Sequence, residues 1–321
     1  MSVIQQNPVL QAETSHGLFK LSFNAIGSRC MIQFRTSSAE TARSFRTAAL
    51  DWIRDFELQY SRFIADSELS RINAAAGGAV VAISDEFSKM LDLCDLVHVH
   101  SKGVIDPTSL PLTQLWDRAE KSQVVPSAED LAKTLHVVGW GQVERTPGGV
   151  RLPHPGMSLD FGGFGKEYAV DRLVQIAGDF GISDLLVDLG RDIATRGRPP
   201  DFSHWVIGVE DALTLDKPLL RAALSGLSMA SSGNYRRYRT ISGNRYGHQI
   251  DPRTGETAST EIDAVTCIAA SCLVAGLFSQ AAFILGTRDG LHLIESQPGV
   301  EGLVQVAGKL HRTQKFHHHE I

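Results

Sequence analysis

The feature of this sequence that most constrains its fold is a cluster of three glycines directly before an amphipathic stretch, in Asp160-Phe161-Gly162-Gly163-Phe164-Gly165-Lys166. Apolar residues after the cluster recur with the spacing of one helix face, and Gly181 follows as a stop, which predicts a helix from about 166 to 180. The short apolar run Ser158–Phe161 predicts a strand, so the glycines would form a strand-to-helix turn. Backbone N–H groups at such a turn can approach a phosphate closely, with Lys166 alongside.

The glycine cluster fits no standard nucleotide motif. A P-loop needs a glycine five positions before its Gly-Lys pair and a hydroxyl residue after it, where this chain has Asp160 and Glu167. The dinucleotide pattern G-x-G-x-x-G needs a glycine where Tyr168 stands. A purely structural role therefore stays open, in which the glycines only let a helix pack closely on a sheet.

A second segment, His248-Gln249-Ile250-Asp251-Pro252-Arg253-Thr254-Gly255, places an imidazole beside a tightly turned acidic loop. Taken alone, His248 fits a hairpin histidine, and Asp251–Gly255 fits a turn with proline at its favoured second position. Together with the glycine cluster, the segment indicates a site for a phosphorylated ligand, because an imidazole that titrates near neutral pH can accept or hold a proton. The two segments favour an enzyme over a scaffold.

The charge balance and the start of the chain limit the classes of partner. The 321 residues include 31 Lys and Arg against 36 Asp and Glu, a formal net charge of −5. No long run of charge occurs, so we expect no nucleic-acid partner. Residues 1–8 lack a basic segment, an apolar segment and a lipid-attachment cysteine, and no apolar stretch is long enough to span a bilayer. As the sequence stands, these features predict a cytoplasmic protein without a transmembrane segment.

The cysteines and the terminal histidines carry no clear site. Cys30, Cys94, Cys267 and Cys272 show no C-x-x-C spacing and lie among apolar residues, which predicts buried free thiols. The run His317–His319 is expected to be a solvated tail.

Hydrophobic periodicity predicts a mixture of helices and strands without repeats. Strands in both hairpins and crossovers favour an α+β fold, and we expect one compact unit because no linker rich in Ser, Gly or Pro divides the chain. Helices are expected at Ala39–Tyr60, after Asp66 or Ser67, and at Ser84–Val99, Leu110–Ala119 and about Ala270–Leu285. Further strands are expected at Phe19–Phe23, Cys30–Phe34, Gly149–Leu152, Leu185–Leu189, Ile193–Arg196, Trp205–Val209, Ala222–Leu224 and, last in the chain, Gly302–Ala307.

Five blocks of the sequence resemble one family in order and spacing, the FAD:protein FMN transferases or ApbE-like family. No single block is specific, but an ordered set that covers roughly Phe23 to Ile294 is. The blocks are Tyr60–Asn73, Gly103–Trp116, Leu159–Asp171, Ser231–Tyr235 and Tyr246–Gly255.

The resemblance implies a fold and an activity. The fold would be a single α+β domain of the T-fold-related type over residues 17–310, with FAD held between two lobes and with flexible termini at 1–16 and 311–321. The activity would be Mg²⁺-dependent cleavage of the FAD diphosphate and transfer of FMN to a threonine hydroxyl of a partner protein, with release of AMP. Family members often act in the periplasm or at a membrane.

The resemblance also implies roles for individual residues. It implies that His248, Asp251 and Lys166 are catalytic and that the backbone carbonyl of Gly163 binds the metal. It implies FAD contacts from Phe63, Val104, Ile105, Asp106, Asp160, Gly162, Gly163, Lys166, His248 and Gln249.

The chain departs from the family pattern on its late helix. The family has an Asp and a Thr there, four positions apart and so on one face, as Mg²⁺ ligands; this chain has Gly276 and Gln280. A carboxylate usually anchors Mg²⁺, so the loss of both side chains weighs against the metal here. Glu167 replaces a usual glycine, Ser231 replaces a threonine, and Arg191 replaces the second glycine of a Leu-Gly-Gly-Asp motif. The guanidinium of Arg191 could supply positive charge in place of the metal.

These observations leave three functional interpretations. The first is an FMN transferase that uses FAD, which the apparently intact pocket blocks favour. The alternative is a non-catalytic protein of the same fold that binds FAD or another flavin, which the missing metal side chains favour. A metal-free phosphodiesterase acting on another nucleotide has little to support it.

Overall fold

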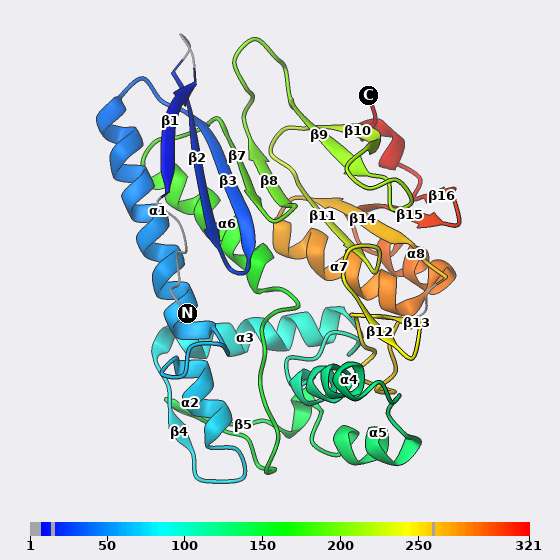
Figure 1. The fold of residues 1–321 in the computed structure, drawn as a ribbon. Coiled ribbons are helices and arrows are strands. Elements are labelled where there is room, and N and C mark those ends of the chain that lie inside the picture. Colours follow the sequence, from blue (N-terminus) through cyan, green and yellow to red (C-terminus); the bar gives the residue numbers. More distant parts are fainter. Residues whose placement is uncertain (1–7, 14–16, 259–260) are drawn as a thin grey trace.

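Nine antiparallel strands form the sheet on which this fold is built, in the order β1-β2-β3-β7-β8-β11-β14-β15-β16 (Figure 1). The computed structural model describes residues 8–13, 17–258 and 261–321. Adjacent strands pair antiparallel throughout, which confirms the expected α+β class. The strands are β1 Val9–Glu13, β2 Leu18–Ala25, β3 Ser28–Arg35, β7 Leu185–Leu189, β8 Asp192–Arg196, β11 Ser228–Gly233, β14 Ala264–Ala269, β15 Glu301–Val306 and β16 Lys309–Arg312.

Four helices cover one face of the sheet: α1 Ala39–Tyr60, α6 Gly165–Asp179, α7 Cys272–Leu285 and α8 Thr287–Glu295 (Figure 1). Their apolar stripes face the strands; in α1, Phe45, Ala49 and Ile53 recur every four residues and are fully buried. Helix α6 contacts β7 and β8, and α7 contacts β11 and β14. The two helices also contact each other, so the glycine cluster before α6 lies next to α7.

The opposite face of the sheet is covered by the hairpin of β9 Trp205–Glu210 and β10 Pro218–Leu224 and by the C-terminal residues. Trp205, Ile207 and Val209 alternate inward along β9, as a half-buried strand requires. Phe316, in a short 3₁₀ helix, is fully buried in the same cluster.

Secondary structure extends into both segments that were expected to be flexible termini. Phe316 anchors residues 311–321 to the sheet because burial of a phenyl ring stabilises the ordered end. At the other end, residues 9–13 form β1 and pair with β2. Residues 1–7 and 14–16, which belong to the same expectation, lie outside the described residues.

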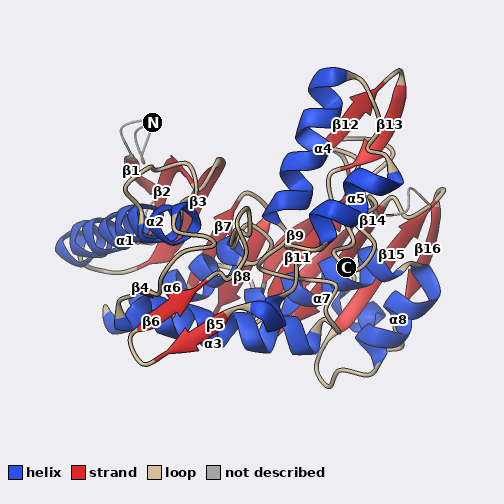
Figure 2. Cartoon of the chain, turned by 90° about the horizontal axis from the view of Figure 1, so that it is seen from below, coloured by secondary structure: helices blue, strands red, loops and turns tan. Residues whose placement is uncertain are grey.

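A second group of elements packs below the helix layer in the view of Figure 1, and Figure 2 shows the same group from below. Figure 2 shows the hairpin of β12 and β13 beside α4, in agreement with the contacts between α4 and β12. The elements are α2 Glu68–Ala74, α3 Asp85–His100, α4 Leu110–Ser122, α5 Ala128–Leu135, a small sheet of β4 Val81–Ala82, β6 Gly149–Arg151 and β5 Glu144–Thr146, and the hairpin of β12 Tyr238–Ile241 and β13 Asn244–Gly247.

The predicted strand at Ser158–Phe161 is wrong. Leu159 instead bonds to a side chain: its N–H donates to Asn73 Oδ1 at 2.7 Å, and Asn73 Nδ2 donates to its carbonyl at 2.9 Å. The N–H of Asp160 donates to the Pro107 carbonyl at 2.8 Å. Because these partners replace a neighbouring strand, the glycines follow a loop clamped by α2.

The other predicted elements are confirmed to within a few residues, and several elements were missed. Helix α5 was missed although Ser127 and Asp130 form a capping box at its start. Helix α8 directly follows Gly286 and was missed as a separate helix. The strand at Gly302–Ala307 was predicted to be last, but β16 follows it. The strands β1, β4, β5, β11, β12, β13 and β14 were not predicted.

The four cysteines are buried free thiols, as predicted. None of the helices in the described ranges combines the length and the apolar character needed to cross a membrane.

The clamp on Leu159 yields a stability prediction. We expect Asn73→Ala to lower the free energy of unfolding by about 1–3 kcal/mol, because it leaves the buried N–H and carbonyl of Leu159 without partners. Urea denaturation measures the change. Asn244→Ala, at an exposed position on β13, is the control and should change little. Equal stability of the two variants would show that the clamp is dispensable.

Candidate active site

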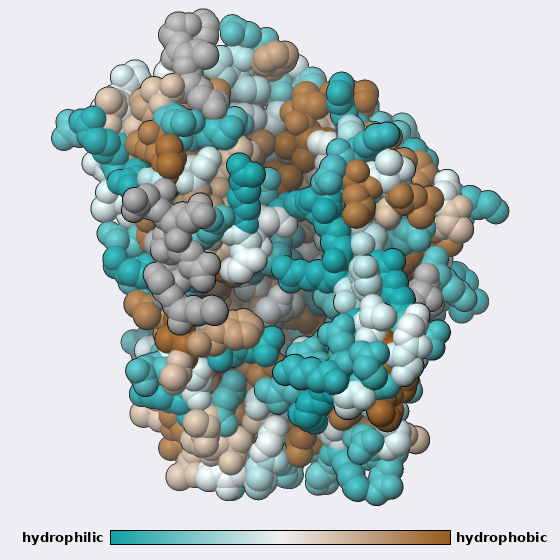
Figure 3. Space-filling model, in the orientation of Figure 1, coloured by the Kyte–Doolittle hydropathy of each residue, from teal (hydrophilic) through white to brown (hydrophobic). Residues whose placement is uncertain are grey.

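Three hollows meet along one cleft, and Gly162 and Arg237 line all of them. The Phe63 hollow, about 400 Å³, is lined by Phe56, Tyr60, Phe63 and Phe161 among others. The glycine hollow, about 280 Å³, is lined by Gly163, Lys166, Asp192 and His248 among others. The Asp106 hollow, about 380 Å³, is lined by Val104, Ile105, Asp106 and Ile250 among others. The space-filling view shows the molecule hollowed near its centre, with hydrophilic side chains along the margin (Figure 3).

The glycine corner, the turn of residues 162–165 at the start of α6, offers fewer free backbone N–H groups than the sequence suggested. The N–H of Gly162 donates to Asp160 Oδ1 at 3.2 Å, and the N–H of Gly165 donates to the Phe161 carbonyl at 2.7 Å. Among the described residues, no acceptor takes the N–H of Gly163. Side-chain cations rather than a row of backbone N–H groups therefore supply most of the positive charge here.

Lys166 is a fixed cation at the first turn of α6. Its Nζ donates to Asp192 Oδ2 at 2.8 Å, and the Asp192 carboxylate is buried. Burial alone would lower the pKa of Lys166, but the charges of Asp192 and then Glu167 outweigh burial and raise it. Lys166 therefore stays protonated, which suits binding of an anion and not proton abstraction.

His248 is held as a neutral imidazole with one nitrogen free. Its Nδ1 lies 3.0 Å from the Arg237 carbonyl and 3.0 Å from Asn234 Oδ1. A carbonyl oxygen only accepts, so Nδ1 carries the proton and Nε2 keeps its lone pair. Burial, and then the charges of Arg237, Arg239 and Lys166, lower the pKa of His248 to about 4, against the hydrogen bond to the Arg237 carbonyl. A neutral imidazole next to fixed cations can accept a proton.

Three arginines, Arg191, Arg236 and Arg237, line the glycine hollow. The sequence suggested Arg191 only as a replacement for the charge of the metal, and it did not suggest Arg236 or Arg237. Arg236 and Arg191 both pair with Glu210, which ties two segments of the rim together. The guanidinium of Arg191 is thus partly neutralised, which weakens the idea that it replaces a metal. Among the described residues, no carboxylate forms an ion pair with Arg237, which lines all three hollows as Gly162 does. The pair Arg236-Arg237 just after the Ser231–Tyr235 block was the available signal.

The Phe63 hollow presents aromatic side chains to the cleft. Phe63 is 78% exposed and carries the Arg62 guanidinium over its ring at 4.5 Å. Arg62 also lies 3.4 Å from Asp160, so the arginine links this hollow to the glycine corner. Burial raises the pKa of Asp160, against the charge of Arg62 and the hydrogen bond from Gly162. The exposed face of Phe63 is available to stack on a planar ring.

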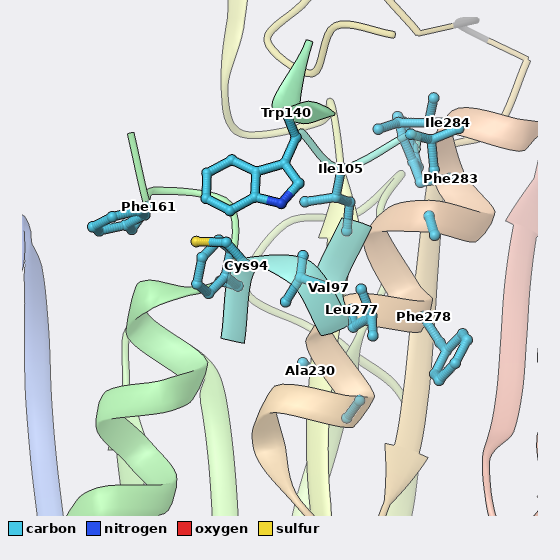
Figure 4. Close-up of a cluster of buried hydrophobic side chains, with 14 of the residues drawn as sticks. Cys94, Val97, Ile105, Trp140, Phe161, Ala230, Leu277, Phe278, Phe283 and Ile284 are labelled. Atoms are coloured by element: carbon cyan, nitrogen blue, oxygen red, sulfur yellow. The ribbon is translucent and has the colours of Figure 1, made fainter. Parts of the chain in front are cut away.

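The segment Val104–Asp106 serves the core as well as the cleft. Val104 and Ile105 are buried, and Ile105 lies in the cluster with Trp140 and Ile284 (Figure 4). Asp106 Oδ1 accepts from the N–H and the hydroxyl of Thr108 at 2.7 and 2.5 Å, and Oδ2 accepts from the N–H of Trp140 at 2.9 Å. The Asp106 carboxylate thus holds two loops together at the wall of its hollow.

Gln249 is in the cleft, whereas Asp251 is not. Gln249 is buried and lines both the glycine hollow and the Asp106 hollow. Asp251 lines none of the three hollows; its Oδ1 accepts from the N–H of Arg253 at 2.9 Å, and its Oδ2 accepts from Arg253 Nη2 at 2.7 Å. The structure thus does not bring Asp251 together with the other predicted site residues, and its carboxylate stabilises its own turn.

Oxygen atoms that border the glycine hollow determine whether a divalent cation fits there. Within the described part of the chain, no group of three His, Cys, Asp or Glu side chains could hold a metal. Two buried oxygens in this hollow nevertheless lack hydrogen-bond partners, Oε2 of Glu167 and Oε1 of Gln280. Burial, and next the charge of Asp192, raise the pKa of Glu167 to about 8. Two unpartnered oxygens that border one hollow fit a hard cation that also binds substrate phosphates and water.

Comparisons with known proteins agree with the fold and the blocks. A family model described as ApbE family matches residues 26–304. A Treponema pallidum protein named FAD:protein FMN transferase is 30% identical over 254 residues, which are 74% of this chain and 70% of the relative. A Haemophilus influenzae protein of the same name is 28% identical over 247 residues, 73% of this chain and 70% of the relative.

Solved structures extend the likeness to nearly the whole chain. The ApbE protein of Thermotoga maritima matches with a TM-score of 0.85 and 27% identity, over 95% of this chain and 99% of that chain. The flavinyl transferase ApbE of Pseudomonas stutzeri, in its apo form, shares the fold with a TM-score of 0.82 and 24% identity, over 98% of each chain. The match to the family model and the identity to the Treponema relative together show that this chain belongs to the ApbE family.

Proposed function

We propose that this protein is an FAD:protein FMN transferase, which cleaves the FAD diphosphate and attaches FMN to a threonine hydroxyl of a partner protein, with release of AMP. The observation that carries the proposal is the make-up of the cleft: a polar hollow with fixed cations and a neutral imidazole meets two further hollows, of about 400 and 380 Å³, at Gly162 and Arg237. FAD has matching parts, a diphosphate that joins two ring systems. The names of the relatives support the same activity.

Charge complementarity supports the diphosphate in the glycine hollow. Lys166 is held in place by a buried carboxylate, and Arg237 keeps a guanidinium without an ion pair among the described residues. Cations fixed before the ligand arrives need no reorganisation when negative charge develops on the phosphates. The exposed ring of Phe63 offers a stacking surface for one of the two ring systems.

The transfer itself needs a proton acceptor near the phosphates. The acceptor hydroxyl oxygen forms a bond to the phosphorus of the FMN half, the bond from that phosphorus to the bridging oxygen breaks, and AMP leaves with the bonding electrons. The hydroxyl proton passes to Nε2 of His248, the nitrogen that its hydrogen bonds leave free. Lys166 and Arg237 balance the charge on the phosphate oxygens.

A divalent cation fits this hollow through the oxygens of Gln280 and Glu167 and the carbonyl of Gly163. When bound, Mg²⁺ supplies further positive charge to the diphosphate. The family side chains for this ion are absent at Gly276 and Gln280, and this absence favours the alternative of a non-catalytic flavin-binding protein.

A histidine variant tests the proposed role of His248. We expect His248→Ala to lower the rate of transfer by about 10²–10⁴-fold while FAD still binds, because the variant removes the proton acceptor but leaves the cations. The assay incubates purified protein with FAD, Mg²⁺ and a threonine-bearing acceptor, and follows AMP by chromatography and protein-bound flavin by fluorescence on a denaturing gel. His100→Ala, at the exposed end of α3, is the matched control.

The outcomes of this assay separate the two functional candidates. AMP release with labelled acceptor from the unchanged protein supports the transferase. FAD binding without AMP release selects the non-catalytic flavin-binding protein. Transfer by His248→Ala at the unchanged rate would remove the imidazole from the proposed chemistry.

The protonation of His248 gives a separate prediction. Because its pKa is lowered from 6.5 to about 4, we expect the imidazole to stay neutral from pH 8 down to about pH 5. The unfolded chain binds a proton there at higher pH, so this residue makes stability fall as the pH falls from 6.5 towards 4. NMR titration of the imidazole C–H signals, assigned with His248→Asn, measures the pKa. A midpoint at or above 6.5 contradicts the prediction.

A further inference from the structure

Helix α7 carries a glycine at the point where a side chain of α6 crosses it. A Cβ added at Gly276 would lie 2.5 Å from Cγ and 2.7 Å from Oε1 of Glu167. Real Cβ atoms do not come so close to other heavy atoms, so the absence of a side chain at Gly276 provides the space that Glu167 fills. A carboxylate from α6 therefore lies where α7 has no side chain of its own.

Packing and capping do not account for the carboxyl group of Glu167. Its Oε2 is buried and has no hydrogen-bond partner among the described residues. Asp171, one turn further along α6, shows what a structural carboxylate looks like here: its oxygens accept from the N–H groups of Cys272 and Leu273 at 2.8 and 2.9 Å. A buried carboxylate oxygen without a partner is unfavourable, so a missing partner is indicated.

A second unpartnered oxygen lies one turn away on the same face of α7. Gln280 is four residues after Gly276, which places the two positions side by side on the helix surface. Its Oε1 is buried without a partner and lies 3.3 Å from the Cβ position of Gly163. No described donor takes up the carbonyl oxygen of Gly163. Glu167, Gln280 and Gly163 all line the glycine hollow, together with Lys166 and His248.

We propose that Glu167 binds a divalent cation in the glycine hollow, supplying from α6 the carboxylate that Gly276 cannot supply from α7, with the amide oxygen of Gln280 as a second ligand. The ion is a hard cation such as Mg²⁺ or Mn²⁺, because the ligands are a carboxylate, an amide oxygen and a carbonyl. Mg²⁺ sites commonly use one or two carboxylates and leave the remaining positions to water and substrate phosphates. The inference rests on the proposed function, since the FAD diphosphate would complete the shell.

Two variants test the position of the carboxylate. Glu167→Gln keeps the size of the side chain and removes its charge. The double variant Glu167→Gly with Gly276→Asp moves the carboxylate from α6 to α7 and should relieve the close approach that Gly276→Asp alone would create. Binding of Mn²⁺ to the full chain, with and without FAD, is measured by electron paramagnetic resonance of the free ion. Glu295→Gln, at an exposed position on α8, is the control.

We expect Glu167→Gln to bind Mn²⁺ at least about tenfold more weakly. Loss of even a residue that only hydrogen-bonds to a metal ligand typically lowers metal affinity by at least about that factor. FAD binding in metal-free buffer should not weaken, and the double variant should recover Mn²⁺ binding. Unchanged Mn²⁺ affinity in Glu167→Gln, or no Mn²⁺ binding by the unchanged protein with FAD present, overturns the inference.

The same measurements distinguish this failure from failure of the proposed function. If the protein transfers FMN but binds Mn²⁺ independently of Glu167, the proposed function is supported and only the role of Glu167 as a metal ligand is rejected. Mn²⁺ binding through Glu167 without transfer would keep the cation site and favour a flavin-binding protein. Circular dichroism of each variant shows that a lost signal does not come from unfolding.

Discussion

The packing of α6 against α7 is the constraint on which the rest of the cleft depends. Asp171 ties the two helices together by accepting hydrogen bonds from the first turn of α7. This contact fixes the relative register of the helices, so that Glu167 meets Gly276 and Gly163 meets Gln280. Both helices are also fixed to the sheet, α6 on β7 and β8 and α7 on β11 and β14. The positions of the polar groups in the cleft are therefore set by the core and not by flexible loops.

The positive charges of the cleft are stabilised from behind by carboxylates of the fold. Asp192, at the start of β8, holds Lys166, and Glu210, at the end of β9, holds Arg191 and Arg236. Each carboxylate fixes the direction of a cation and reduces its net charge. Arg237 has no such partner among the described residues, and it lines all three hollows. A ligand with two phosphates thus meets one unneutralised guanidinium and several fixed donors.

Local patterns in the sequence predicted the elements whose structure depends on neighbouring residues. They failed where a side chain from a distant part of the sequence determines the local structure. The period of α1 and the hairpin of β2 and β3 could be read directly, because their buried faces repeat every turn or every second residue. The corner before α6 could not, because its backbone is satisfied by Asn73, a residue 86 positions away. The ordered blocks brought Lys166 and His248 to one hollow. They also suggested Asp251, which lies outside the three hollows and pairs with Arg253.

The two departures from the family pattern at Glu167 and Gly276 are independent in the sequence and form one contact in space. Considered separately, Glu167 is an acidic residue with no evident role, and Gly276 is a metal-ligand position that has lost its side chain. The contact changes this interpretation, because the space opened by the glycine is the space that the glutamate fills. Packing explains the size of that side chain, but a neutral residue of similar volume would fill the same space without burying an unpartnered carboxylate oxygen. The carboxyl group therefore needs a reason other than packing, and the neighbouring oxygen of Gln280, which also lacks a hydrogen-bond partner, supplies one.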